Sequence, residues 1–195
     1  MRFSTFLATA TVLAASLSAV SAHADELVVN GGFETGDFSG WSLFDNTGFT
    51  SVNGNNVATG SYSAEFGAVG STGGITQNLT TVPGGSYLLQ FDLQNDGGSG
   101  TSFNAAFDGQ DLLTMTNPPS FGYTHYSYTV TASDPLSALT FTFRQDPYYY
   151  HLDNVSVQSV VGGAVPEPAT WATLIFGLGM VGAMMRRRRT AMAAV

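Results

Sequence analysis

The feature that most constrains this fold is a strict alternation of apolar and polar residues, which recurs along the chain between short runs of turn residues. Between Ser86 and Leu93 every second residue is large and apolar, and Ser137–Arg144 repeats the pattern with Leu139, Phe141 and Phe143. Successive side chains of a β-strand point to opposite faces, so a period of two predicts strands with one buried face. No convincing 3.6-residue helical period appears before residue 169.

Short segments of this kind are separated by glycine-rich turns such as Asn53-Gly54 and Asp108-Gly109. The predicted strands are Leu27–Asn30, Trp41–Phe44, Tyr62–Phe66, Ile75–Leu79, Ser86–Leu93, Ser102–Phe107, Leu112–Met115, 126–130, Ser137–Arg144 and Tyr149–Val157. Strands this short and this closely spaced predict an all-β, antiparallel two-sheet jelly-roll sandwich over residues 25–158.

The charge of this domain is one-sided. It holds 13 of the 14 acidic residues but only Arg144 among the six basic ones, and the whole chain has neither lysine nor cysteine. The resulting formal charge of −12 repels phosphate backbones and excludes nucleic acid as an expected partner. Divalent cations and neutral polymers are compatible with such a surface, and disulfides cannot stabilise it.

The first 24 residues have the organisation of a secretory signal peptide. Arg2 is followed by an apolar stretch from Phe6 to Val20 and by Ala22-His23-Ala24, a small-residue cleavage site. The mature chain is therefore expected to begin at Asp25, outside the cytoplasm.

The C-terminal segment predicts a membrane-inserted precursor. A linker, 159–168, precedes an apolar run of 17 residues, 169–185, which as a helix would reach about 25 Å, the short end of a membrane span. The basic end, 186–195, begins with Arg186, Arg187, Arg188 and Arg189. Four arginines hold that end in the cytoplasm, so the domain must face outward. A permanent single-span anchor is the alternative interpretation.

This tail resembles the PEP-CTERM sorting signal of Gram-negative bacteria. The residues that carry the resemblance are Val165, Pro166, Glu167 and Pro168, together with the apolar run and the four arginines. The resemblance implies cleavage near the Pro-Glu-Pro element by a membrane protease of the exosortase type. It also implies release or transfer of the domain to the cell surface or extracellular matrix, much as a hydrophobic GPI signal is removed.

Both ends of the domain carry a second resemblance, to jelly-roll carbohydrate-binding modules and the wider galactose-binding-like class. The motifs are Asn30-Gly31-Gly32-Phe33-Glu34-Thr35-Gly36, Gly40-Trp41 and His151-Leu152-Asp153-Asn154-Val155-Ser156-Val157. The resemblance implies a structural calcium ion held by Glu34 and Asp153, with carbonyl groups near residues 60–63 completing an all-oxygen site. The alternative is that Glu34 is solvated and Asp153-Asn154 only shapes a bulge.

Aromatic residues supply the candidate ligand contacts. Neighbours on a strand face opposite sides, so Tyr148-Tyr149-Tyr150 cannot all lie in the core, and Tyr149 should leave it together with His151. Sugar rings stack on such rings, and Trp41 is a further candidate, with a place in the core as its alternative. The expected ligand is a neutral exopolysaccharide; the alternative is that Tyr149 packs beneath a loop.

Signatures of catalysis are weak. The sequence has no G-x-S-x-G element, no H-E-x-x-H element and no cysteine nucleophile. We therefore expect a non-enzymatic protein of the envelope or matrix that interacts with exopolysaccharide. A purely structural surface protein and a small glycan-active enzyme remain alternatives, because 13 acidic residues make some carboxylate pair unavoidable.

Overall fold

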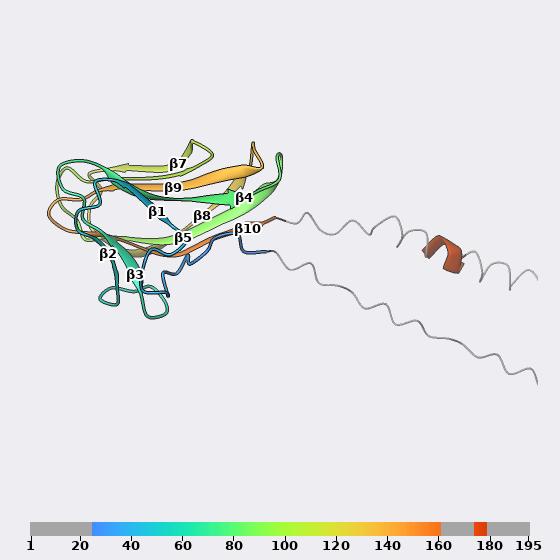
Figure 1. The fold of residues 1–195 in the computed structure, drawn as a ribbon, viewed down its shortest axis with the longest axis horizontal. Helices are drawn as coiled ribbons and strands as arrows, with labels where there is room; N and C mark the ends of the chain where they lie inside the picture. The colour runs from blue at the N-terminus through green and yellow to red at the C-terminus, as the bar shows by residue number, and fades with distance from the viewer. Residues whose placement is uncertain (1–24, 161–173, 179–195) are drawn as a thin grey trace, which may run out of the picture.

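The computed structural model describes residues 25–160 and 174–178, and residues 25–160 form ten strands in two antiparallel sheets (Figure 1). Sheet A has the order β2 (Thr50–Asn53), β3 (Ser63–Phe66), β10 (Tyr150–Ser159), β5 (Ser86–Asn95) and β8 (Phe121–Thr131). Sheet B has the order β1 (Ser42–Asp45), β4 (Gly73–Thr80), β9 (Leu136–Arg144), β6 (Ser102–Phe107) and β7 (Gln110–Thr116). The predicted two-sheet antiparallel sandwich is confirmed.

The connections between strands mostly cross from one sheet to the other. Only β2–β3 and β6–β7 are neighbours both in the sequence and within a sheet. The second of these hairpins turns at Asp108 and Gly109, which both have positive φ, as the predicted two-residue turn requires.

The core lies between the sheets and is rich in aromatic rings. The alternation predicted for β5 and β9 is confirmed, because Leu89, Phe91 and Phe141 are fully buried while the residues between them are partly exposed. Phe66 of sheet A stacks on Phe143 of sheet B with 3.7 Å between ring centroids. Such contacts join the two layers by apolar burial and ring packing, in a chain without disulfides.

The predicted strand Leu27–Asn30 is not a strand. It runs beside β10 but pairs only at isolated points, through the Glu26–Gln158 bridge and a hydrogen bond from Leu27 N to Val157 O (2.9 Å). Asn30 has a φ of 54°, which turns the chain away before a ladder can form.

The strand β2 was not anticipated. Its only large apolar residue is Val52, and it ends at Asn53, which the sequence assigned to a turn. An edge strand with one apolar residue carries no detectable period of two, and its pairing with β3 alone defines it.

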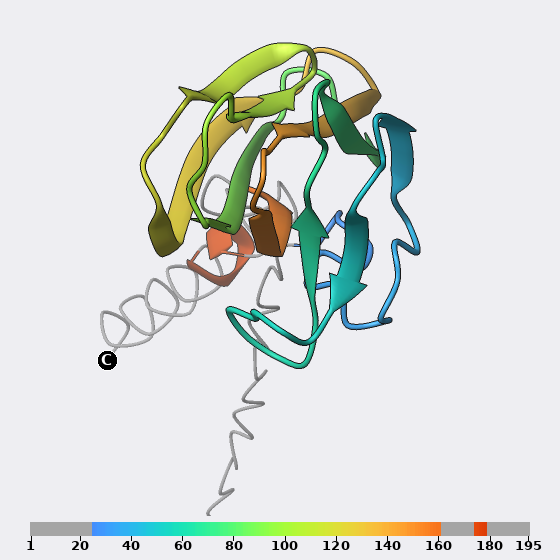
Figure 2. The same ribbon diagram turned by 90° about the vertical axis from the view of Figure 1, so that its left-hand side faces the viewer.

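The strand ends define two poles. The loop pole carries the connections 46–49, 67–72, 96–101, 117–120 and 145–149 (Figure 2). β10 begins there, with Tyr150 between Phe66 and Asn95, and ends at Ser159 beside Tyr87. Glu26 pairs with Gln158, so both ends of the domain leave at the opposite, chain-end pole, about 30 Å away at the rise of a strand (Figure 1).

Several sequence-based assignments lie outside the described residues. They are the signal peptide 1–24, most of the linker 159–168, and most of the apolar run 169–185 with the basic end 186–195. β10 continues to Ser159, and residues 174–178 are helical. In the part of the chain that the structure describes, no helix has both the length and the apolar character needed to cross a membrane.

Candidate functional site

Glu34 and Asp153 meet at the same loop, although they are far apart in the sequence. Asp153 Oδ2 accepts hydrogen bonds from the backbone N–H groups of Ala58 (3.0 Å) and Thr59 (3.1 Å). Glu34 accepts from the N–H groups of Ser61 (2.9 Å) and Tyr62 (3.2 Å). The two carboxylates therefore hold the loop between β2 and β3 from both sides.

Two glycines allow this close approach. A Cβ atom on Gly60, whose φ is +74°, would lie 2.1 Å from Glu34 Oε1. A Cβ atom on Gly31 would lie 1.8 Å from the carbonyl oxygen of Val155 in β10. The glycines of the N-terminal motif and of the loop are thus required by the contacts themselves.

Asp153 is fully buried at a bulge in β10, where the register with β5 shifts between Asp153 and Ser156. Burial raises the pKa of its carboxyl group, and the N–H groups of Thr59, Asn154 and Ala58 only partly oppose that effect. The bulge, which was the alternative to a calcium site, is therefore present. Asp153 also holds the loop between β2 and β3 through its hydrogen bonds to Ala58 and Thr59.

Glu34 and Asp153 could supply some, but not all, of the oxygen ligands that a calcium ion needs. Two carboxylates, one of them buried, are hard oxygen ligands. Ser61 and Tyr62 direct their N–H groups at Glu34, and these hydrogen bonds occupy part of the acceptor capacity of its carboxylate. No group of three or more His, Cys, Asp or Glu side chains placed to hold a metal occurs within residues 25–160 and 174–178. Further ligands would have to be backbone carbonyls or water.

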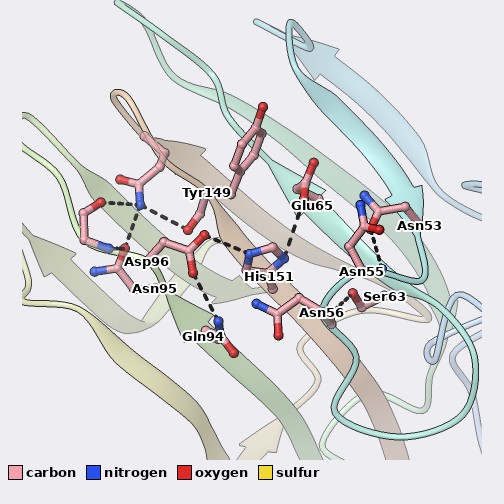
Figure 3. A network of polar contacts seen from close by, with 12 residues as sticks. Asn53, Asn55, Asn56, Ser63, Glu65, Gln94, Asn95, Asp96, Tyr149 and His151 are labelled. Carbon is pink, nitrogen blue, oxygen red and sulfur yellow. Dashed lines mark hydrogen bonds and ion pairs between the residues drawn. The ribbon is translucent and has the colours of Figure 1, made fainter.

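A second polar cluster lies on the outer face of sheet A, at the loop pole (Figure 3). His151 Nε2 is 3.1 Å from Asp96 Oδ2, and Gln94 Nε2 donates to Asp96 Oδ1 (3.1 Å). On the other side of the imidazole, Nδ1 is 4.0 Å from Glu65 Oε2 and has no hydrogen-bond partner. We call Glu65, His151 and Asp96 the acidic cluster.

Further polar residues continue the same face. His125 Nδ1 is 2.8 Å from Asp92 Oδ1, and Asn154 Nδ2 donates to Asp92 Oδ2 (2.6 Å). Tyr123 Oη donates to the carbonyl oxygen of Asn56 (2.8 Å), and burial raises the pKa of this phenol to about 12. Tyr123 of β8 therefore also holds the loop between β2 and β3 in place.

The segment that carries Tyr149 is held by a buried amide. Gln145 Nε2 donates to Asn95 Oδ1 (2.7 Å) and to the carbonyl oxygens of Gly97 (2.8 Å) and Tyr149 (3.1 Å). Asp96 N donates to the same Tyr149 carbonyl (3.0 Å). The backbone of Tyr149 is therefore fixed next to the acidic cluster.

The Tyr149 ring is half-buried and forms one wall of a small hollow at the loop pole. The other lining residues are Phe49, Gly67, Val69, Asp146, Pro147 and Tyr148. Phe49 is 69% exposed and Tyr148 53% exposed, so aromatic surface is open to solvent here. A Cβ atom on Gly67 would lie 2.6 Å from the Tyr149 ring, which shows that the ring rests against bare backbone. We call this the aromatic hollow.

The other two predicted ligand contacts are differently placed. Trp41 is in the core, stacked on Phe33 with 5.9 Å between centroids, and its Nε1 donates to Asn30 O (3.2 Å). This corrects its assignment to a ligand surface. His151 leaves the core face as expected, with its ring centroid 6.3 Å from that of Tyr149, but it lies between Glu65 and Asp96 and is only 3% exposed.

The C-terminal tail matches a known protein-sorting signal. Residues 164–189 match the model of the PEP-CTERM protein-sorting motif. The chain carries this motif. It includes the Pro-Glu-Pro element and the four arginines, and it implies processing by an exosortase, export, and sorting to the bacterial cell surface.

The domain is similar in fold to solved carbohydrate-binding modules. TmCBM61, solved in complex with β-1,4-galactotriose, matches with a TM-score of 0.56 and 16% identity over 68% of this chain and 97% of that chain. The C-terminal family 22 carbohydrate-binding module of a Clostridium thermocellum protein matches with a TM-score of 0.51 and 16% identity, over 72% and 96%.

A part of an enzyme shares the fold as well. The enzymatically active domain of tailspike protein 4 from bacteriophage CBA120 matches with a TM-score of 0.55 and 17% identity, over 69% of this chain but only 21% of that one. At such identities the similarity shows the sandwich fold alone. A comparison of the sequence with curated proteins found no match.

Proposed function

We propose that this chain is the precursor of a non-enzymatic surface or matrix protein of a Gram-negative bacterium, which binds extracellular polysaccharide at its loop pole. The observation that carries the proposal is the aromatic hollow, which lies directly beside amide and carboxylate side chains on a sandwich similar to carbohydrate-binding modules. Aromatic planes with convergent polar groups are what sugar recognition needs.

The position of the hollow supports this function. Both ends of the domain leave at the chain-end pole, so a tail inserted in the membrane would leave the loop pole free to meet a polymer outside the cell. A formal charge of −12 disfavours polyanions and is compatible with neutral or weakly charged glycans. Binding of a neutral glycan by stacking and hydrogen bonds should depend little on salt.

A non-enzymatic role is supported by how the carboxylates of this face are used. Asp92 and Asp96 each face a histidine and accept an amide hydrogen bond, so both carboxylates already have side-chain partners in this network. Glycoside hydrolysis would need two carboxyl groups free to act as acid and as base or nucleophile on either side of a substrate.

The glycan proposal is tested by screening a glycan array with the protein and with two variants. Tyr149→Ala should weaken binding about 5- to 150-fold, the range that corresponds to the loss of one aromatic stacking contact. Tyr62→Ala removes an exposed tyrosine ring that packs on Gly36, outside the hollow, and should leave binding unchanged. If no glycan binds, the purely structural interpretation is correct; if Tyr149→Ala binds as the original protein does, the hollow is not the site.

The sorting proposal is tested by intact-mass analysis of the protein recovered from the cell surface. Processing at both ends should give a chain that starts near Asp25 and ends near Pro166. A surface protein that retains Arg186–Arg189 would show that the tail is a permanent anchor.

We further propose that calcium binds between Glu34 and Asp153. The supporting observation is that Asp153 is fully buried without a cationic partner among the described residues, so that a nearby cation would offset the cost of its desolvation. The ion would stabilise the fold and would take no part in chemistry.

A further inference from the structure

We propose that the acidic cluster selects a polysaccharide that carries free primary amines, with Glu65 and Asp96 accepting hydrogen bonds from the ammonium groups. The inference rests on the proposed glycan site and names the class of ligand that this site prefers. It is carried by the arrangement of acceptors around the buried imidazole of His151 (Figure 3).

The proton on His151 can be assigned from its partners. A carboxylate only accepts hydrogen bonds, so the ring nitrogen 3.1 Å from Asp96 Oδ2, which is Nε2, carries the hydrogen. Nδ1 lies 4.0 Å from Glu65 Oε2 and has no hydrogen-bond partner, although the His151 side chain is only 4% exposed. The ring therefore makes no hydrogen bond to Glu65, and the Glu65 carboxylate can accept hydrogen bonds from a ligand.

The face around this pair offers no fixed positive charge. The chain has no lysine, and Arg144, the only arginine within the described residues, belongs to β9 in the other sheet. The three close contacts between a basic and an acidic side chain among the described residues are made by histidines, on Glu65, Asp92 and Asp96, and a histidine carries a charge only when it is protonated. The carboxylates of the acidic cluster therefore have no permanent cation of their own.

An ammonium group fits this set of acceptors better than a hydroxyl group does. It brings three hydrogens and a positive charge, whereas a hydroxyl brings one hydrogen and no charge. Hydrogen bonds between charged partners are about twice as strong as those between neutral ones. An N-acetyl group on the same sugar nitrogen removes the charge and leaves a single hydrogen, so acetylation should weaken the contact.

The cluster can be reached from the aromatic hollow. The side chains of Glu65 and Asp96 are 17% and 32% exposed, and the Tyr149 ring lies next to His151. A sugar stacked on Tyr149 would bring a substituent of its ring, or of the next residue of the chain, over the acidic cluster. The exposed aromatic faces would also attract an ammonium group.

The test compares two probes that differ only in acetylation, a glucosamine oligosaccharide and the N-acetylglucosamine oligosaccharide of the same length. Calorimetric titration at a mildly acidic pH, at which the amines of the probe are protonated, should show the free-amine probe binding about tenfold more tightly, the equivalent of one charge-assisted hydrogen bond. That preference should shrink as salt is raised, because it is electrostatic. Equal or weaker binding of the amine probe would overturn the proposal.

Two matched variants separate a local contact from general attraction to an acidic protein. Glu65→Gln removes one charge from the acidic cluster and should abolish most of the preference for the amine. Asp111→Asn removes one charge from β7, at an exposed position in the other sheet, and should leave the preference intact. An equal loss in both variants would mean that the attraction is diffuse, and the proposal would be rejected.

The outcome also distinguishes this inference from the function on which it rests. If neutral oligosaccharides bind through Tyr149 but the amine probe shows no preference, the glycan site stands and the amine selectivity fails. If no probe of either kind binds and the array is also negative, the glycan site itself is wrong and the selectivity falls with it.

Discussion

Two groups of carboxylates in this domain differ in the partners that they meet. Glu34 and Asp153 accept hydrogen bonds from four backbone N–H groups of one loop, so they belong to the fold. Glu65 and Asp96 meet side chains only, around a histidine on the outer face of sheet A. Backbone donors cannot move without rearranging the chain, whereas side-chain partners can be exchanged for a ligand. The first group should therefore control stability and the second group binding.

The largest effect on stability should come from Asp153→Ala. The substitution removes a buried carboxylate and leaves the N–H groups of Ala58, Thr59 and Asn154 without an acceptor. At about 1 kcal/mol or more for each lost bond, the free energy of unfolding should fall by about 3–4 kcal/mol. Denaturant titration measures this value. A loss below about 1 kcal/mol would contradict the assignment of Asp153 to the stability of the fold.

Calcium should produce the next largest effect. An ion that binds only the folded state adds about 2.7 kcal/mol at a hundredfold excess over its Kd, which should appear as a higher melting temperature. Glu34→Gln should remove most of this increment. Identical melting curves with calcium and with chelator would show that no calcium binds. The two carboxylates would then stabilise the fold only by accepting hydrogen bonds from the loop N–H groups.

The smallest effect on stability is expected for Glu65→Gln. Glu65 is partly exposed and lies 4.0 Å from His151, so the pair contributes little to folding. The free energy of unfolding should change by about 0.5 kcal/mol or less in the same denaturant titration. A loss comparable to that of Asp153→Ala would place the acidic cluster among the structural elements and weaken the argument for a ligand.

The sequence predicts the parts of this fold in which a local pattern decides the structure. The alternation in β5 and β9 identifies their buried residues, and the Asp108-Gly109 turn identifies the hairpin that it closes. Leu27–Asn30 has the composition of a strand, but it pairs with β10 only at isolated points, and the positive φ of Asn30 turns the chain away. The composition of a segment does not show whether a neighbouring strand pairs with it along its whole length.

The candidate site is less predictable because it is assembled across strands. Glu65, Asp96 and His151 come from or next to three different strands, and only the register of β3, β10 and β5 brings them together. The sequence indicates that Tyr149 and His151 share a side of the predicted strand 149–157, but it does not show that the imidazole lies between two carboxylates. A tryptophan can belong either to the core or to a ligand-binding surface. Its packing on Phe33 places Trp41 in the core.

The central claim, that the loop pole binds glycan, is tested most directly by titrating the isotope-labelled protein with an oligosaccharide from the array and following its backbone amide signals. The account predicts concentration-dependent shifts confined to residue 49 and residues 65–69, 94–97 and 145–151, which surround the aromatic hollow and the acidic cluster. Shifts centred instead on the exposed face of sheet B, for example along β7, or on the loop held by Glu34 and Asp153, would contradict it.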